Sequence, residues 1–189
     1  MNKKKNVCII SYDLTSGGSE LHAKKITKYI KNNYFWVSLG IENRKNFLEI
    51  NGLKKKIFLK FRIFKIFYAL NVLSEFINEN KISIVYAIGM YPSFLASILK
   101  LRHNFKLIIT RRGEIRYFEL LKYFYLLFFI YILADKIETN SKSIFEKFKK
   151  NLFFKKKVYF IQNLVEKKIF AGPFKKLIEK KKTILGFAL

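Results

Sequence analysis

Short runs of β-forming residues alternate with longer amphipathic runs along this sequence of 189 residues. The first run, residues 6–11 (NVCIIS), is apolar without polar alternation, which is typical of a strand buried on both faces of a sheet. Helical runs separate such strands, and this order favours parallel strands joined by right-handed crossover helices. We therefore predict an α/β fold with a doubly wound, Rossmann-like, mostly parallel sheet. Strands are expected at 6–11, 34–39, 56–59, 82–88, 106–110, 136–139, 158–161 and 183–189. Helices are expected at 20–31, 63–78, 92–101, 117–133 and 141–149. The apolar stripes predicted for the first two are Leu21, Ile26, Tyr29 and Ile30, and Ile63, Ile66, Phe67, Leu70 and Ile77.

Composition limits the classes of protein to which this chain can belong. Apolar residues make up 51% of the sequence, which excludes an intrinsically disordered chain, and 189 residues suit one folded domain. The chain has a single cysteine, Cys8, and two histidines, His22 and His103. A disulfide scaffold and a cysteine-based zinc site are therefore excluded, and we expect neither a metal ion nor a prosthetic cofactor.

The charge is strongly positive, since 38 basic residues less 13 acidic residues give +25. Of the basic residues, 32 are lysine and only six are arginine. Proteins that bind nucleic acids depend on arginine for bidentate contacts with bases and phosphates, so we do not expect a nucleic-acid partner. Lysines solvated on every surface are the favoured interpretation, and attraction to an anionic membrane surface is the alternative.

We expect a cytoplasmic protein. The first 13 residues include a basic segment but lack the apolar run of about 7–15 residues that a signal peptide needs. The uncharged run at 123–134 would form a helix of about 18 Å, too short for roughly 30 Å of bilayer hydrocarbon, so a buried helix is predicted there. Residues 61–76 place Arg62 and Lys65 beside an aromatic stripe. A core helix is favoured for this segment, and peripheral contact with the inner face of the membrane is the alternative.

Ligands of open α/β sheets bind beyond the carboxyl ends of the strands, so the loops at those ends hold the candidate residues. The first such loop carries Gly17 and Gly18 ahead of a helix. Adjacent glycines let the backbone approach an anion, and a helix start offers free N–H groups and a partial positive charge. A phosphate contact and a structural turn with Ser19 as the N-cap are both compatible with this pattern.

The loop after residues 106–110 is the densest polar cluster of the sequence. Residues 110–116 contain three of the six arginines, among them Arg111 and Arg112, together with Glu114. Arginine in a chain that otherwise uses lysine indicates planar recognition of a phosphate or carboxylate. The alternative is a surface ion pair with Glu114 or Glu119.

Three further residues are candidates for the same edge of the sheet. Asn140 and Ser141 follow the strand at 136–139, where they can hydrogen-bond a hydroxylated ligand, or Ser141 can simply cap the next helix. His22 lies on the first helix, either facing the cleft or on the surface. Two histidines at these positions cannot build a Ser-His-Asp or Cys-His catalytic set, so hydrolase chemistry is not expected.

Five segments of the chain agree, in order and spacing, with one family. Residues 134–141 (ADKIETNS) resemble the family pattern A-D-K-I-I-A-N-S. The other matches are 17–20 (GGSE) with G-G-A-E, 82–89 with D-V-V-H-x-H-G, 106–114 (KLIITRRGE) with V-x-S-R-R-D, and 157–166 (KVYFIQNLVE) with K-V-x-V-I-x-N-G-V-D. On these segments the sequence resembles the N-terminal half of the family 4 glycosyltransferases, which are retaining, use nucleotide-sugar donors and have the GT-B fold.

The resemblance implies the acceptor-side half of a GT-B enzyme. Gly17 and Gly18 would approach the phosphates or the transferred sugar of the donor, while Arg111, Arg112 and Glu114 would line the acceptor side. The donor would be a nucleotide-sugar co-substrate, and the family needs no metal ion. The residues that hold the nucleotide in this family belong to its C-terminal half, beyond the segments that match here.

One function and one alternative are expected. The first is a glycosyltransferase that transfers a sugar from a nucleotide-sugar to a glycan or lipid-linked acceptor in surface polysaccharide or lipopolysaccharide synthesis. Its acceptor domain would occupy residues 1–165, and residues 166–189 would form a linker and the first strand of a nucleotide-sugar-binding domain. We expect no turnover by the 189-residue chain alone. The alternative is a non-catalytic acceptor- or membrane-binding subunit that pairs with a separate donor-binding chain.

Overall fold

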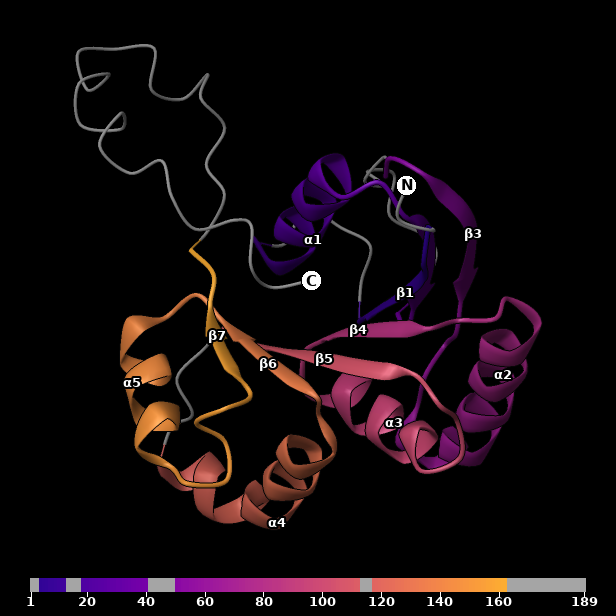
Figure 1. Cartoon of the computed structure of the whole chain (residues 1–189). Coiled ribbons are helices and arrows are strands. Elements are labelled where there is room, and N and C mark those ends of the chain that lie inside the picture. Colours follow the sequence, from indigo (N-terminus) through magenta and orange to yellow (C-terminus); the bar gives the residue numbers. More distant parts are fainter. Residues whose placement is uncertain (1–3, 13–17, 41–49, 113–116, 163–189) are drawn as a thin grey trace, which may run out of the picture.

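The computed structural model describes residues 4–12, 18–40, 50–112 and 117–162 (Figure 1). In these residues the predicted alternation of strands and helices is confirmed. The described strands are β1 (Asn6–Ser11), β2 (Asn33–Ser38), β3 (Leu53–Phe58), β4 (Ile84–Ile88), β5 (Lys106–Arg111), β6 (Lys136–Thr139) and β7 (Val158–Phe160). The α-helices are α1 (Gly18–Tyr29), α2 (Ile66–Glu79), α3 (Met90–Lys100), α4 (Tyr117–Leu133) and α5 (Lys142–Lys150), with a short 3-10 helix, η1 (Ile63–Lys65), before α2.

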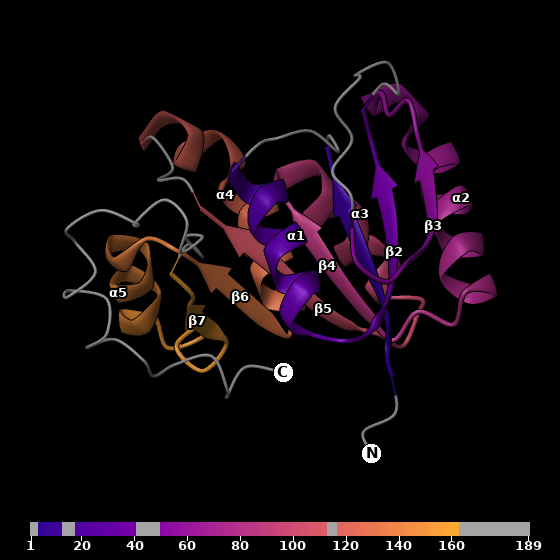
Figure 2. The same cartoon turned by 90° about the horizontal axis from the view of Figure 1, so that it is seen from above.

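The described strands form one sheet in the order β3-β2-β1-β4-β5-β6-β7, and every neighbouring pair is parallel. The chain moves one way across the sheet from β1 to β3 and the other way from β4 to β7 (Figure 2). This is the doubly wound, Rossmann-like topology that the sequence predicts. The winding reverses between β1 and β4, and ligands of such sheets bind at that reversal, beyond the carboxyl ends of the strands.

Helices cover both faces of the sheet. Figure 1 shows α2, α3 and α4 on one face and α1 on the other. The larger core lies under the first group, where Leu73, Leu95 and Leu107 are fully or almost fully buried. The smaller core lies under α1, where Trp36 is fully buried and its indole N–H donates to the Ser11 hydroxyl at 2.9 Å. Both cores hold β1 and β4 rigidly, and the candidate site stands at the ends of these strands.

The inner face of α1 differs from the one that the sequence predicts. Leu21 and Tyr29 are expected to face the core, yet Tyr29 is 72% exposed and the buried residues are His22, Ala23 and Thr27. These three recur at the spacing of one helix face. The apolar pattern of this helix is weak. A small alanine and two polar side chains therefore form the side that is buried against the sheet.

Two other helices are apolar on both sides but buried on only one. In α2 the buried residues are Ala69, Leu73, Phe76 and Ile77. Phe67, which is expected on that face, is 79% exposed, so this expectation is wrong. The buried helix predicted for α4 is buried on one side only, because Ile130 is buried while Tyr125 is 86% exposed. Hydrophobicity alone does not tell which side of such a helix meets the sheet.

Among the described residues, no helix combines the length and the apolar character needed to cross a membrane. The expected strand at 183–189 and the expected domain boundary at 165/166 lie outside the described residues. Ser141 is the N-cap of α5, as predicted for one of its two roles, and its hydroxyl accepts a hydrogen bond from the backbone N–H of Ile144 at 3.5 Å.

Candidate ligand-binding site

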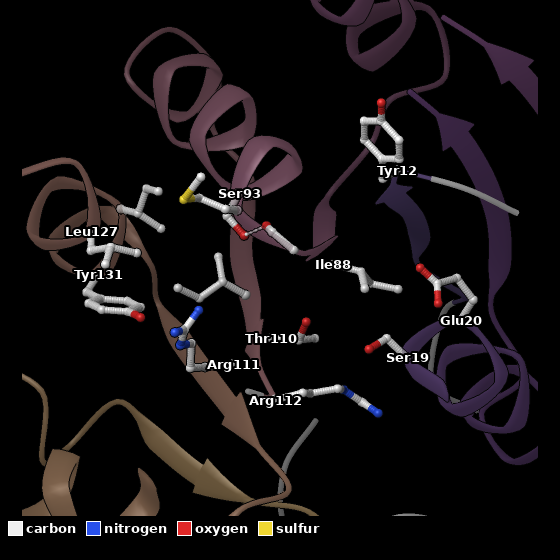
Figure 3. Close-up of a pocket in the computed structure, with 14 residues that line it drawn as sticks. Tyr12, Ser19, Glu20, Ile88, Ser93, Thr110, Arg111, Arg112, Leu127 and Tyr131 are labelled. Atoms are coloured by element: carbon white, nitrogen blue, oxygen red, sulfur yellow. Dashed lines mark hydrogen bonds between the residues drawn. The ribbon is translucent and has the colours of Figure 1, made fainter. Parts of the chain in front are cut away.

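A pocket of about 310 Å³ opens at the carboxyl edge of the sheet, where the winding reverses (Figure 3). Its walls come from five places in the chain: the end of β1, the start of α1, the β4–α3 junction, the end of β5 and the facing side of α4. One side is polar and the other apolar. The lining residues are Tyr12, Ser19, Glu20, Ile88, Gly89, Met90, Ser93, Ile109, Thr110, Arg111, Arg112, Leu127, Ile130 and Tyr131.

The β4–α3 junction brings backbone close to this pocket. Gly89 has a φ of +97°, a conformation that side chains of L-residues rarely adopt, and it ends the buried strand abruptly. The hydroxyl of Ser93, one turn into α3, donates to the carbonyl oxygen of Gly89 at 2.6 Å. This turn starts α3 beside the end of β4, so the first turn of the helix forms one wall of the pocket.

A buried glutamate, which does not itself line the pocket, lies behind its polar side and contacts the lining residue Arg112. Glu138 lies in β6 with only 3% of its surface exposed. Its Oε1 accepts a hydrogen bond from Arg112 Nη2 at 2.8 Å, and its Oε2 accepts one from the Tyr86 hydroxyl at 2.6 Å. The Nε2 atom of His22, from α1, lies 3.1 Å from Oε1. Residues from α1, from β4 and from the end of β5 thus meet at one carboxylate in β6.

The surroundings of Glu138 favour its charged form. Burial by itself would raise the pKa of the carboxyl group, but hydrogen bonds with His22 and Tyr86 and the positive charge of Arg112 lower it below the ordinary value. Burial, reinforced by the negative Glu138, raises the pKa of Tyr86 well above its ordinary value, so the phenol stays protonated and can donate. The carboxylate therefore holds the Arg112 guanidinium as its counter-ion at the edge of the pocket.

Arg111 and Arg112 are the residues through which the site can bind an anion. They are consecutive at the end of an extended strand, so their side chains point to opposite sides. In Figure 3, Arg111 extends toward Tyr131 of α4 and Arg112 toward Ser19 at the start of α1. Two guanidinium groups thus flank one pocket, an arrangement suited to phosphate or carboxylate groups.

Tyr131 adds a polar group on the opposite wall. Its hydroxyl is buried and has no hydrogen-bond partner among the described residues. Burial raises the pKa of this phenol, and the nearby charge of Arg111 opposes that effect. Because a buried hydroxyl without a partner is costly, it marks a position where a ligand can supply the missing hydrogen bond.

The structure brings together some of the residues that the sequence singles out. Arg111 and Arg112 both line the pocket. His22 is buried against Glu138, so the surface alternative for this histidine is wrong. Asn140 and Ser141 do not line the pocket. Gly18 is the first residue of α1, while Gly17 and Glu114 lie outside the described residues.

Two further points correct the sequence interpretation. Ser19 cannot be the N-cap of α1, because the helix already begins at Gly18 and Ser19 lines the pocket from its first turn. Glu138, Tyr86 and Tyr131 were not foreseen as site residues. One signal was available for Glu138, since it stands in a predicted strand (KIET, residues 136–139) of a parallel sheet, and such strands are usually buried on both faces.

Within the described part of the chain, no three histidine, cysteine, aspartate or glutamate side chains gather in a way that could hold a metal ion. The charges that the pocket presents are those of its two arginines and of Glu20 at the start of α1. The site is thus suited to bind a ligand with an anionic group and an apolar or ring-shaped body of modest size.

No protein-family model matches this sequence, and no curated protein matches it in sequence. Solved structures do match. A glycosyltransferase from Rickettsia africae superposes with a TM-score of 0.63 at 18% identity, covering 95% of this chain and 50% of that one. HepE from Anabaena in complex with UDP-glucose gives 0.71 at 14% identity, covering 93% and 49%. The lipopolysaccharide outer core galactosyltransferase WaaB gives 0.61 at 15% identity, covering 86% and 46%.

An enzyme with another activity shares the same architecture. A UDP-N-acetylglucosamine 2-epimerase from Rickettsia bellii superposes with a TM-score of 0.56 at 11% identity, covering 77% of this chain and 41% of that one. At such identities the similarity concerns the fold alone. The chain spans about half the length of the structures it matches. It has an α/β Rossmann-like fold with a parallel sheet that matches one half of a GT-B fold.

Proposed function

We propose that this chain is the acceptor-side half of a glycosyltransferase that transfers a sugar from a nucleotide-sugar donor to a glycan or lipid-linked acceptor. The match to half of a GT-B fold supports a nucleotide-sugar enzyme, because HepE was solved with UDP-glucose. The likeness to WaaB, a lipopolysaccharide galactosyltransferase, supports a surface glycan as the product. The resemblance of the sequence motifs to family 4 supports a retaining reaction.

The observation that carries this proposal is the pair of arginines at the reversal point of the sheet. Arg112 is fixed by the buried Glu138 at 2.8 Å, so it is held in place before any ligand arrives. Arg111 extends across the pocket toward the buried hydroxyl of Tyr131. A phosphate of the acceptor would bind between these groups. A guanidinium that is already held in place loses little conformational entropy when the phosphate binds.

The glycine loop ahead of α1 has a different role in this proposal. Gly18 begins the helix, and together with Gly17 it would approach the donor phosphates from this half of the cleft. Positive charge from the helix start would help to stabilise the diphosphate that leaves when the sugar is transferred. No metal ion has a part in this proposal.

Acceptor binding is tested by calorimetric titration of the full chain with a water-soluble, short-chain isoprenyl diphosphate. The corresponding uncharged isoprenyl glycoside is the control ligand. The variant Arg111→Gln should weaken binding of the diphosphate by about tenfold or more, the loss expected when one charge-assisted hydrogen bond is removed. Arg102→Gln is the matched control, because Arg102 is exposed in the turn after α3, away from the pocket. Equal affinities of the two ligands, or equal losses in the two variants, would contradict the proposal.

Transfer itself is tested with labelled nucleotide-sugars and lipid-linked acceptors. We expect no turnover by the 189-residue chain alone, because the residues that would hold the nucleotide of the donor belong to the other half of the fold. Turnover should need a second half, supplied on the same or another chain. If the chain binds acceptors but never supports transfer with any such partner, the alternative of a non-catalytic binding subunit is favoured.

A further inference from the structure

The outer side of α4 is apolar and open to solvent. The inner side of this helix carries Leu127, Ile130 and Tyr131, which line the pocket. The exposed side carries Phe124, Tyr125, Phe128 and Ile132, which are 50%, 86%, 37% and 44% exposed. Phe124, Phe128 and Ile132 follow one another at intervals of four residues, so they share one helix face. We call these four residues the outer face of α4.

A second segment extends this apolar surface. Residues 147–157 form the last turn of α5 and the connection from it to β7, and Figure 1 shows this connection beside α4. The ring of Phe128 lies against that of Phe153, with centroids 6.3 Å apart. Leu152 and Phe153, at the tip of the turn, are 77% and 69% exposed. A contiguous patch of this kind on a protein surface marks a site of interaction.

The charge around this patch is almost entirely positive. Residues 142–157 contain seven lysines and one glutamate, Glu146. The exposed apolar pair of the tip is flanked on both sides by exposed lysines, namely Lys149, Lys150, Lys155 and Lys156. A membrane surface binds proteins through this combination. Apolar side chains enter the headgroup region, and the lysines around them contact anionic headgroups.

We propose that the chain lies on an anionic phospholipid membrane through the outer face of α4 and residues 147–157. A domain that closes over the pocket would cover the carboxyl edge of the sheet. The 147–157 segment immediately precedes β7 and so lies at the amino edge of the sheet. The six-residue strand β5 separates this edge from the carboxyl edge by roughly 20 Å. Such a domain would leave the segment free, so a bilayer is the occupant that the charge favours.

A second exposed aromatic surface lies on α2 and the turn before it. Phe64, Phe67 and Tyr68 are 77%, 79% and 64% exposed. Residues 60–79 have three basic and two acidic side chains, giving +1, whereas residues 142–157 have seven basic and one acidic, giving +6. The difference in charge favours the α4 surface as the one that meets anionic lipid.

The placement gives the proposed acceptor site a short path to the membrane, an argument that rests on the proposed function. The outer face of α4 would touch the lipid while its inner face lines the pocket. The pocket would then lie about 10 Å above the headgroups, one helix diameter. A diphosphate on a lipid carrier could reach Arg111 across that distance with its lipid tail still in the bilayer.

The test is co-sedimentation of the full chain with vesicles at about 0.15 M salt. Vesicles of phosphatidylglycerol and phosphatidylcholine in equal parts should retain the chain, and vesicles of phosphatidylcholine alone should not. Replacing Lys149, Lys150, Lys155 and Lys156 by glutamine should lower the partition coefficient by roughly a hundredfold or more, because each lysine near the surface strengthens binding about fivefold. The double variant Leu152→Ser/Phe153→Ser should lower it by roughly tenfold or more.

Two control variants make the test specific. The first replaces four exposed lysines elsewhere, Lys4, Lys31, Lys54 and Lys106, by glutamine and changes the net charge equally. The second is Phe64→Ser/Phe67→Ser on the α2 surface. Both should retain the binding of the unchanged chain, and both tip variants should keep the circular dichroism spectrum of the folded chain.

Several results would overturn this proposal. Equal retention by neutral vesicles, equal losses in the lysine variant and its control, or release by the α2 variant alone would each do so. Loss of a dimer in the tip variants, without vesicle binding by the unchanged chain, would assign the patch to a second copy instead. Vesicle binding is measured without any sugar donor or acceptor, so it stands or fails independently of the calorimetric test of acceptor binding.

Discussion

Replacing Glu138 by glutamine should destabilise the fold by about 3 kcal/mol. The glutamate and Arg112 expose only 4% and 12% of their side chains, and their atoms are 2.8 Å apart. Glutamine has the same shape, and its carbonyl oxygen can still accept from Arg112. It carries no charge, however, and so removes the negative charge that Glu138 places against the guanidinium. Breaking a buried pair in this way costs about 3–5 kcal/mol, and the lower end applies because Arg112 borders an open pocket.

The single tryptophan makes this loss measurable. Trp36 is fully buried in the core beside α1, so its fluorescence should change when the chain unfolds. In equilibrium unfolding by urea, a loss of about 3 kcal/mol should lower the midpoint by about 1–2 M. Glu146→Gln is the matched control, because this glutamate is exposed on α5 and the change should stay within about 0.5 kcal/mol.

A double-mutant cycle separates the ion pair from other effects of the substitution. Arg112→Gln should also destabilise the fold, since it leaves Glu138 buried with less compensation. In the variant with both changes neither charge remains, so its loss should be smaller than the sum of the two single losses by about 2 kcal/mol. A Glu138→Gln variant within 1 kcal/mol of the unchanged chain, or strictly additive losses, would refute the account of this cluster.

Three further predictions concern the pH dependence of stability, a glycine turn and the single cysteine. The stability contributed by Glu138 should be complete above its ordinary pKa of 4.5 and be lost as the pH falls through its lower pKa in the folded chain. The variant Glu138→Gln should therefore flatten the acid limb of a plot of unfolding free energy against pH. Gly52→Ala should lower the unfolding free energy by about 2 kcal/mol, because Gly52 has a φ of +74° and an added Cβ would lie 2.9 Å from the carbonyl oxygen of Asn32; an unchanged urea midpoint would contradict this. Cys8 is fully buried with its pKa raised by burial, so Ellman's reagent should label it only after unfolding, and rapid labelling of the folded chain would show the burial to be wrong.

Most of the fold was predictable from local patterns. Residues 136–139 and 117–133 read as a strand and a helix and form β6 and α4 with the same limits. The order of elements also predicted the parallel sheet, because strands separated by helices of this length can pair only through crossovers. The faces of the helices were not predictable in the same way. Tyr29 and Phe67 fit an apolar stripe as well as the residues that are in fact buried.

The candidate site was predictable in part. Arg111 and Arg112 stood out because arginine is rare in this lysine-rich chain and because they follow a strand. The buried cluster was not foreseen, since its members come from α1, β4, β6 and the end of β5. Which of them meet depends on the register between strands, such as that of Thr110 with Glu138, and a single sequence does not encode register visibly.

The alternation of strands and helices, and hence the edge of the sheet where a ligand can bind, can be read from local patterns. Both follow from the periodicity of apolar residues, a property of neighbouring positions in the chain. The contact of Glu138 with Arg112 at the pocket and the apolar face that α4 turns to solvent become visible only once the chain is folded. Both depend on packing between elements far apart in the sequence, where the space left by one element determines which side chain the next can bury.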